Sequence, residues 1–389
     1  MASSARTKYW ALAILALALL TNRWMGWQEG IQYLTAVDVE DGYLPVAAAA
    51  PGLPSELIPF HKAQRFFVPY VVGSIAKGSG APIPSVFFAG TALATGALLA
   101  IFWWLLGALQ LPPRRRLLAF ALFVFQPYAL RYYGIVPGMF SDLTFELGTG
   151  ILLAGLFFRK SSLPWIGLAL AALSRQTALL LLPGVVLWIW FGWKEKPARS
   201  RALWATGLSL WTLFFYEATG LLAARIGSAN VNAEHLTALF TWILSPDFSF
   251  PKMAEHTLRC TLPLLPAAIL LLREPWKQWP RESLFLLLMA LVVAAQPFLA
   301  GPTVTGQNAA RLITLGLLPL VVAWAIAARE KEWPLIPACA MALLLFAGSF
   351  HHLYTVIGPH GPMGSAALQL VVMVLAPACA RWAACTARH

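Results

Sequence analysis

Residues 84–109 read PSVFFAGTALATGALLAIFWWLLGAL, a run without a charged side chain. As an α-helix, a run of this length covers about 39 Å, more than the ~30 Å hydrocarbon core of a bilayer. The run also lacks the alternation of polar and apolar residues that marks a strand of a membrane barrel. Backbone groups in lipid must bond within their own segment, so the run predicts a membrane-spanning helix.

The composition extends this prediction to the whole chain. Hydrophobic residues make up 59% of the 389 residues, charged residues make up 11%, and the mean hydropathy is +0.69. A soluble globular domain carries about 25% charged residues. We therefore expect a single all-α transmembrane domain, residues 1–389. The predicted spans are residues 9–20, 84–109, 117–135, 142–158, 163–174, 177–193, 202–225, 257–272, 283–300, 308–328, 335–350 and 364–380.

The net charge of +12 has a topological explanation. The basic residues lie in short clusters between apolar runs, which does not indicate nucleic-acid binding. Cytoplasmic loops of membrane proteins are enriched in Lys and Arg, and placing these clusters inside gives about 12 spans with both termini in the cytoplasm. We expect a multi-pass protein of the bacterial inner membrane. The basic clusters that follow the first span lie at residues 114–116, 159–160, 194–201, 273–281, 329–331 and 381–388.

Two segments depart from a simple succession of spans. Residues 26–84 form a long first extracytoplasmic loop, in which the amphipathic stretches 31–50 and 55–77 predict helices lying on the outer membrane surface. The run 163–174 is short for a bilayer that needs about 20 residues. We therefore expect it and its neighbour to be tilted, broken or re-entrant around Arg175.

The first loop carries a group of acids directly after the first span. Asp38, Glu40 and Asp41 lie close to Tyr43, and a helix would place Asp38 and Asp41 on one face. One carboxylate could take a proton from an acceptor as general base, and a second could orient the acceptor or bind a divalent metal. The same acids could instead cap a solvated loop helix.

A second acidic pair opens the run 142–158. Asp142 and Glu146 are four residues apart on one helix face, which is costly in lipid unless that face lines a cavity. Asp142 could equally be the N-terminal cap of its helix. Glu146 lies a turn deeper, where a capping role does not apply.

Four arginines on the predicted outer side are not needed to orient the chain: Arg65, Arg175, Arg259 and Arg311. Guanidinium groups bind phosphates bidentately, so they would suit an enzyme that acts on a lipid phosphate. Arg175 and Arg311 are the best placed, whereas Arg259 fits a side chain that reaches up to the interface. The histidines within residues 351–360 show no metal-ligand spacing.

The sequence lacks the motifs of several common classes of enzyme and transporter. The four cysteines form neither a CxxC pair nor a disulfide framework. No Walker motif, dinucleotide fingerprint, GxSxG or HExxH is present. ATP-driven transport and the usual hydrolase mechanisms are therefore not indicated.

Together these features resemble the GT-C superfamily of integral membrane glycosyltransferases, in particular GT-C-like proteins of bacteria. The resemblance covers roughly residues 1–330 and includes an early span followed by a long acidic outer loop. It rests on DVEDGY at 38–43, QRFFVP at 64–69, Ser141-Asp142, SRQT at 174–177 followed by Pro183, and NAAR at 308–311 followed by Pro319.

The resemblance implies a polyprenyl-phosphate-linked sugar as donor, a glycan, lipid or protein as acceptor, and inverting transfer outside the cytoplasm. Asp38 or Asp41 matches the general base, Asp142 the second acidic position and Arg175 a contact to the donor phosphate. No cofactor is implied with certainty, and dependence on a divalent metal stays open. The full set of candidate substrate-binding residues is Glu40, Tyr43, His61, Arg65, Asp142, Arg175 and Arg311.

The alternative function is a multi-span transporter or a lipid-carrier flippase, and a non-catalytic membrane assembly protein comes third. Glu146 and Glu217 favour a transporter, which places essential charges near the bilayer midplane. Most acids instead crowd the predicted outer interface, and no internal repeat is found. The transferase is therefore the preferred interpretation.

Overall fold

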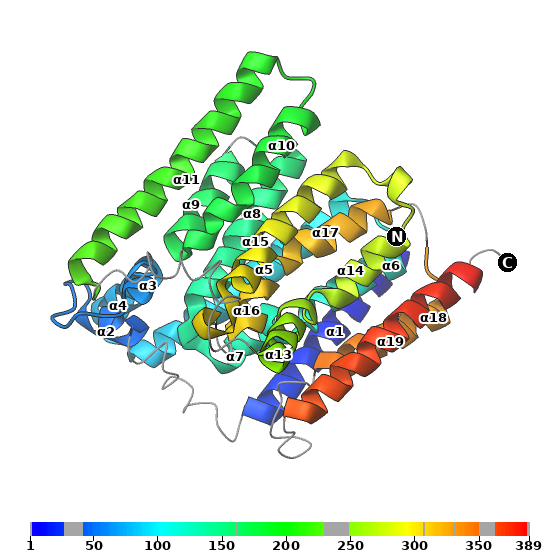
Figure 1. Ribbon diagram of the computed structural model, residues 1–389, viewed down its shortest axis with the longest axis horizontal. Coiled ribbons are helices and arrows are strands. Elements are labelled where there is room, and N and C mark those ends of the chain that lie inside the picture. The colour runs from blue at the N-terminus through cyan, green and yellow to red at the C-terminus, as the bar shows by residue number, and fades with distance from the viewer. Residues whose placement is uncertain are drawn as a thin grey trace.

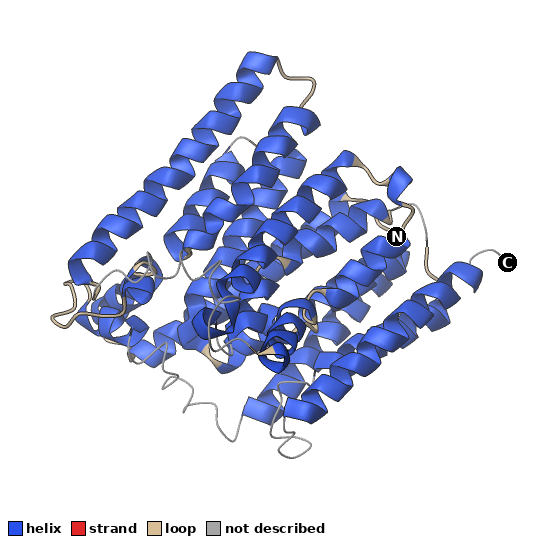
Figure 2. Cartoon of the chain, viewed as in Figure 1, coloured by secondary structure: helices blue, strands red, loops and turns tan. Residues whose placement is uncertain are grey.

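The computed structural model describes residues 2–26, 42–160, 162–228, 249–305, 308–329, 332–349 and 362–386. These residues form helices joined by turns, and their only extended pairing is an isolated bridge between Ile58 and Gly227 (Figure 2). The predicted all-α fold is confirmed. In chain order the segments are α1 Ala2–Gly26, α2 Leu44–Ala49, α3 Phe60–Ala63, α4 Phe67–Ser79, α5 Ile83–Ala108, α6 Pro113–Val124, η3 Pro127–Arg131, α7 Tyr132–Ile135, η4 Pro137–Met139, α8 Phe140–Phe158, α9 Ser162–Ser174, η5 Gln176–Leu181, α10 Leu182–Gly192, α11 Ala198–Ile226, α13 Phe250–Thr261, α14 Leu265–Arg273, η7 Trp276–Gln278, α15 Arg281–Thr305, α16 Ala309–Thr314, α17 Leu317–Ala327, α18 Leu335–Gly348 and α19 Pro362–Thr386 (Figure 1).

Three helical segments among the described residues are long and apolar enough to cross a membrane: Ile83–Ala108, Pro137–Phe158 and Arg281–Pro302. Each coincides with a predicted span. Other predicted spans coincide with shorter apolar helices, such as Ser162–Ser174 and Leu335–Gly348. The membrane character of the chain is therefore supported, whereas the count of about 12 spans stays a prediction.

Several predicted spans are divided into two helices. The run 257–272 forms α13 and α14, the run 308–328 forms α16 and α17, and the run 117–135 passes from α6 into the π-helix η3. Pro127, Pro266 and Pro319 each lie in the first turn of the second helix. Proline has no backbone N–H to donate, so it fits the start of a helix and not its middle.

The first loop contains shorter helices than predicted. The stretch 55–77 holds α3 and α4 with a break between them, and the described part of the stretch 31–50 holds only α2. Helix α4 packs directly on α2, because a Cβ atom on Gly73 would lie 2.0 Å from the carbonyl oxygen of Ala47. The location of these helices at a membrane surface stays a prediction.

Helices α5 and α8 run in the same direction. Gly90 of α5 lies against Phe140 at the start of α8, whereas Trp104 stacks on Phe158 at its end with ring centroids 3.9 Å apart. Asp142 and the end of α8 therefore lie at opposite ends of the helix pair.

Helix α9 returns along α8 in close antiparallel contact. A Cβ atom on Gly148 would lie 2.7 Å from the carbonyl oxygen of Gly167, and one on Gly155 would lie 2.4 Å from the Pro164 ring. Small residues at such positions let two helix backbones approach closely. In this register, the chain runs from the end of α8 back along that helix. Arg175, directly after α9, therefore lies at the level of Asp142.

The basic connections gather at one end of the bundle, called here the basic end. Trp104 and Phe158 place the α5–α6 and α8–α9 connections beside each other. Predicted cytoplasmic clusters that are far apart in sequence thus share this end, and the opposite end is called here the site end. The linking contacts are Arg114 to the Trp333 carbonyl at 2.9 Å, Arg115 to Glu274 at 2.9 Å, Arg116 to the Trp103 carbonyl at 2.8 Å and Arg159 to Glu195 at 2.8 Å.

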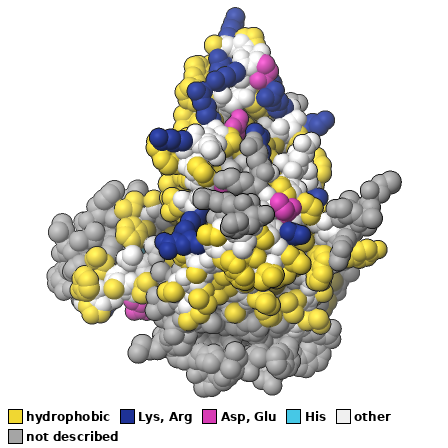
Figure 3. Space-filling view, turned by 90° about the vertical axis from the view of Figure 1, so that its right-hand side faces the viewer, with side chains coloured by type: hydrophobic (Ala, Val, Ile, Leu, Met, Phe, Trp, Pro, Cys, Tyr) yellow, Lys and Arg dark blue, Asp and Glu magenta, His cyan; other side chains and the backbone are white. Residues whose placement is uncertain are grey.

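Large apolar side chains remain exposed on the outer helices. On α11, which forms one edge of the bundle in Figure 1, Leu203 is 66% exposed and Leu221 is 70% exposed. Figure 3 shows hydrophobic side chains gathered over the lower part of one described face. Soluble monomers rarely expose broad apolar patches, so these faces are suited to contact with lipid.

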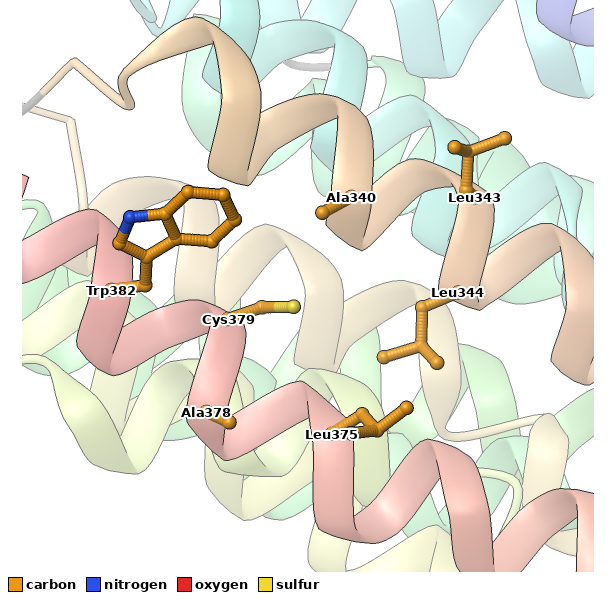
Figure 4. A pocket seen from close by; sticks show the side chains of 7 residues that line it. All are labelled: Ala340, Leu343, Leu344, Leu375, Ala378, Cys379 and Trp382. Atoms are coloured by element: carbon orange, nitrogen blue, oxygen red, sulfur yellow. The ribbon is translucent and has the colours of Figure 1, made fainter.

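A groove of about 540 Å³ lies between α18 and α19 (Figure 4). It contains no charged side chain, so it suits hydrocarbon. Its lining residues are Ala340, Leu343, Leu344, Leu375, Ala378, Cys379 and Trp382.

Candidate functional site

Asp142 is the centre of the candidate site. It lies in the first turn of α8 and is fully buried. Its Oδ1 atom accepts a hydrogen bond from Nη1 of Arg175, and its Oδ2 atom lies 3.4 Å from Nη1 of Arg311. The N-cap of α8 is Met139, which makes no side-chain cap. Asp142 is therefore an ion-pair partner and not the cap that the sequence also allowed.

Arg175 reaches Asp142 because of the close α8–α9 packing. Helix α9 ends at Ser174, and the backbone of Arg175 is extended, with φ −156° and ψ 142°, before η5 begins. The predicted break around Arg175 is confirmed. The guanidinium lies at the turn of a helical hairpin and is 3% exposed.

Arg311 comes from a different part of the chain. It lies in the short helix α16, is 3% exposed, and its guanidinium carbon is 5.9 Å from the centre of the Tyr132 ring. A guanidinium over an aromatic face is stabilised by the ring quadrupole. Two arginines that the sequence separates widely thus share one buried carboxylate.

Arg65 lies beside this group and is half-buried. Its Nη1 atom donates a hydrogen bond to the Tyr43 hydroxyl at 2.8 Å, and it interacts electrostatically with Asp142 and Arg311. Burial lowers the pKa of the Arg65 guanidinium, but Tyr43 and Asp142 raise it, and its net pKa lies above the ordinary arginine value. Arg65 therefore carries a full positive charge. We call Asp142, Arg175, Arg311 and Arg65 the arginine cluster.

Two further buried polar side chains adjoin the cluster. Glu146 lies one turn below Asp142 on α8 and is 2% exposed, and Tyr133 is 0% exposed. Glu146 interacts electrostatically with both Asp142 and Tyr133. Within the described part of the chain, neither carboxylate oxygen of Glu146 nor the Tyr133 hydroxyl has a hydrogen-bond partner. Unmade hydrogen bonds of buried groups cost about 1–3 kcal/mol each.

The described side chains of the site carry more positive than negative charge. They comprise the guanidinium groups of Arg65, Arg175 and Arg311 and the carboxyl groups of Asp142 and Glu146, so their summed charge stays positive even when Glu146 is ionised. Buried charges are costly unless a partner of opposite sign meets them. Several guanidinium groups close together suit an anion with several acceptor oxygens, such as a phosphate group.

The structure brings together some predicted residues and leaves others apart. Asp142, Arg175 and Arg311 meet directly, and Arg65 with Tyr43 adjoins them. His61 is half-buried in α3, four residues before Arg65, and its part in the site stays a prediction. Arg259 pairs with the exposed Glu255 on α13, as expected of an interfacial arginine.

The proposed early acids are not placed. Asp38, Glu40 and Asp41 lie outside the described residues, so their position relative to the cluster stays a prediction. A metal site built on them is equally untested. Among the described residues, no group of three His, Cys, Asp or Glu side chains is arranged to hold a metal ion. Asp142 already has two arginines bound to its oxygens, and these would compete with a cation.

Sequence reasoning did not identify Tyr133 and Tyr132 as site residues. Both follow Arg131 and precede the helix that carries Asp142. The available signal was an aromatic pair shortly before a helix that carries an acid in its first turn. The short segments α7 and η4, which turn the chain back onto α8, were not predicted.

Comparison of the chain with protein-family models, with curated proteins and with solved structures finds no match in any of the three.

Proposed function

We propose that this protein is a GT-C-like membrane glycosyltransferase that moves a sugar from a polyprenyl-phosphate donor to an extracytoplasmic acceptor. The observation that supports the proposal is the convergence of Arg175 and Arg311 on one buried carboxylate, with Arg65 beside them. A lipid-linked phosphodiester offers the negative charge and the acceptor oxygens that suit such a cluster.

In the proposed reaction, Arg65, Arg175 and Arg311 hold the donor phosphate. The acceptor oxygen bonds to the anomeric carbon from the side opposite the phosphate, and the bond from that carbon to the phosphate oxygen breaks. Asp38 or Asp41 takes the acceptor proton as general base. The departing phosphate gains negative charge, which preorganised guanidinium groups stabilise.

The proposed topology follows from the basic end. Cytoplasmic loops are rich in Lys and Arg, so the basic end faces the cytoplasm and the arginine cluster faces the opposite side. The protein would cross the bacterial inner membrane about 12 times with both termini inside. Labelling of single introduced cysteines from each side of the membrane tests this arrangement.

Transfer of labelled sugar from a decaprenyl-phosphate donor, measured with the protein in membranes, tests the enzymatic proposal. Asp38→Asn or Asp41→Asn is expected to abolish transfer while leaving the protein level unchanged, because the base is lost. If both single variants and the double variant keep full activity, the base assignment is wrong.

Arg175→Ala tests the phosphate clamp. It is expected to lower donor use at least about a hundredfold and to affect the acceptor KM less, because a charge-assisted bond to phosphate is removed. Arg259→Ala is the matched control, since Arg259 forms a partly exposed ion pair with Glu255 on its own helix. Equal effects of Arg175→Ala on donor and acceptor would contradict a phosphate clamp.

A flippase or transporter of the same lipid phosphate is the second candidate. Glu146 favours it, because a buried acid without a partner among the described residues is typical of proton-coupled sites. Proteoliposomes that contain labelled donor but no acceptor distinguish the two functions. A transporter moves the lipid across the bilayer under these conditions, whereas the proposed transferase does not.

A further inference from the structure

Glu146 and Tyr133 form a second polar group directly below the arginine cluster. They interact electrostatically with each other and are fully buried, and no hydrogen bond is made to the Glu146 carboxylate or the Tyr133 hydroxyl within the described part of the chain. Thr144 and Thr149 of the same helix, by contrast, donate to the Phe140 and Phe145 carbonyls at 2.8 and 3.0 Å. Glu146 and Tyr133 therefore bring together two carboxylate oxygens and one hydroxyl that lack partners in the described part of the chain.

The two groups together match the hydrogen-bonding chemistry of a sugar. A carboxylate accepts hydrogen bonds, and a phenol both donates and accepts them. Sugar hydroxyls offer donors and acceptors side by side. A second phosphate fits poorly, because neither Glu146 nor Tyr133 brings a positive charge to neutralise it.

The spacing along α8 also fits a sugar attached to a phosphate. Asp142, which marks the level of the arginine cluster, and Glu146 are separated by one helical turn, a rise of about 6 Å. A hexose joined to a phosphate extends over a similar length. A phosphate held by Arg175 and Arg311 therefore leaves its sugar at the level of Glu146.

We propose that Glu146 and Tyr133 form the sugar-binding subsite of the donor, where they hydrogen-bond the sugar hydroxyls and select among sugars. This assignment rests on the proposed function, since the arginine cluster has to hold the donor phosphate. It makes Glu146 and Tyr133 specificity-determining residues. Carbohydrate hydroxyls thereby satisfy the polar atoms that the described chain leaves without partners.

Binding titrations with purified protein in lipid nanodiscs test the subsite. The probes are decaprenyl phosphate without sugar and decaprenyl phosphate carrying mannose, glucose, galactose or arabinose. For the preferred sugar, Glu146→Gln should weaken binding about tenfold or more, and Tyr133→Phe should weaken it severalfold. Both variants should bind sugar-free decaprenyl phosphate within about twofold of the wild type, because the cluster is intact.

The controls separate a binding role from a structural one. Thr149→Val changes a buried polar group of the same helix whose hydrogen bond is local, and it should alter neither affinity. Arg175→Ala should weaken both probes. The melting temperature of each variant shows whether it is folded, and Tyr133→Phe, which keeps the ring, covers the case in which Glu146→Gln fails to fold.

Three outcomes would overturn the inference alone: equal weakening of both probes by Glu146→Gln, no weakening of either, or a wild-type protein to which the sugar adds no affinity. A wild-type protein that binds neither probe would overturn the proposed function, and the sugar subsite with it.

Discussion

The arginines at the two ends of the bundle differ in the groups that pair with their charges. At the basic end, Arg115 pairs with Glu274 at 2.9 Å, and both of its neighbours donate to backbone carbonyls. At the site end, Arg175 and Arg311 share the buried carboxylate of Asp142, and Arg65 lies beside them. Glu146 beside them has no hydrogen-bond partner among the described residues.

The contrast predicts which arginines are structural and which bind a ligand. A charge whose partners lie within the fold holds elements together, as Arg115 and Glu274 join α6 to the end of α14. A group of like charges around one carboxylate is stable only at some cost to folding, and a bound anion can lower that cost. The type of residue is the same at both ends, so the balance of charge among the described residues is what supports the proposed binding role.

Removing the Asp142 carboxylate from the arginine cluster should have the largest effect on stability and on transfer. Asp142→Asn removes the buried carboxylate that Arg175 and Arg311 share, so the free energy of unfolding should fall by about 3–5 kcal/mol and transfer should be lost. Denaturant titration in detergent measures the first effect. Millimolar inorganic phosphate should restore part of the stability, because an anion replaces the carboxylate. An Asp142→Asn protein as stable as the wild type without phosphate would contradict the charge imbalance.

At the basic end, the same kind of change should affect stability alone. Arg115→Met or Glu274→Met removes one partner of a buried ion pair and should cost about 3 kcal/mol, whereas the double variant should cost less than either single one. The folded fraction should keep its donor KM. Additive losses, or a changed donor KM, would show that the Arg115–Glu274 pair is not a purely structural contact.

The helix packing behind the site can be tested separately. Gly148→Ala places a methyl group 2.7 Å from the α9 backbone, so it should cost about 1–3 kcal/mol and weaken donor binding through the Asp142–Arg175 contact. Gly96→Ala on α5 is the matched control, since its Cβ atom meets nothing within 4 Å. Melting temperatures and donor titrations of both variants give the comparison. Equal effects at the two glycines would mean that α8–α9 contact does not position the site.

Arg65 should give the smallest effect. It is half-buried and bonds to Tyr43 and not directly to Asp142. Arg65→Gln should weaken donor binding about tenfold, equivalent to about 1.4 kcal/mol, with little change in melting temperature. A loss as large as that of Arg175→Ala would place Arg65 at the centre of the cluster and not at its edge.

The fold class could be predicted because composition decides it. A run such as residues 84–109 can only be a helix in lipid, and the structure has α5 there. The breaks within other runs were not predicted, although Pro263 and Pro266 occur where α13 gives way to α14. The expected break at Arg175 was recognised because the run before it was too short to span a bilayer.

The site was predicted as separate residues and not as a cluster. Asp142 and Arg175 were each recognised from charge in an apolar context, but they are 33 residues apart, and no local pattern joins them. Their contact depends on the register of α8 against α9, which the glycines permit and the whole fold selects. Tyr133 was missed for the same reason, because a tyrosine in an aromatic-rich chain becomes informative only when its surroundings are known.

The level of Arg175 within the bundle bears on which lipids can reach it. Gly90, seven residues into α5, already lies beside Phe140, so Asp142 is about 10 Å or more below the first residue of α5. In the proposed orientation, a phosphate must move below the hydrated surface layer and lose part of its hydration shell before it contacts any guanidinium group. Abundant phospholipids keep their phosphates in that layer. The depth of the guanidinium groups below it would therefore exclude these phospholipids without any recognition of the headgroup.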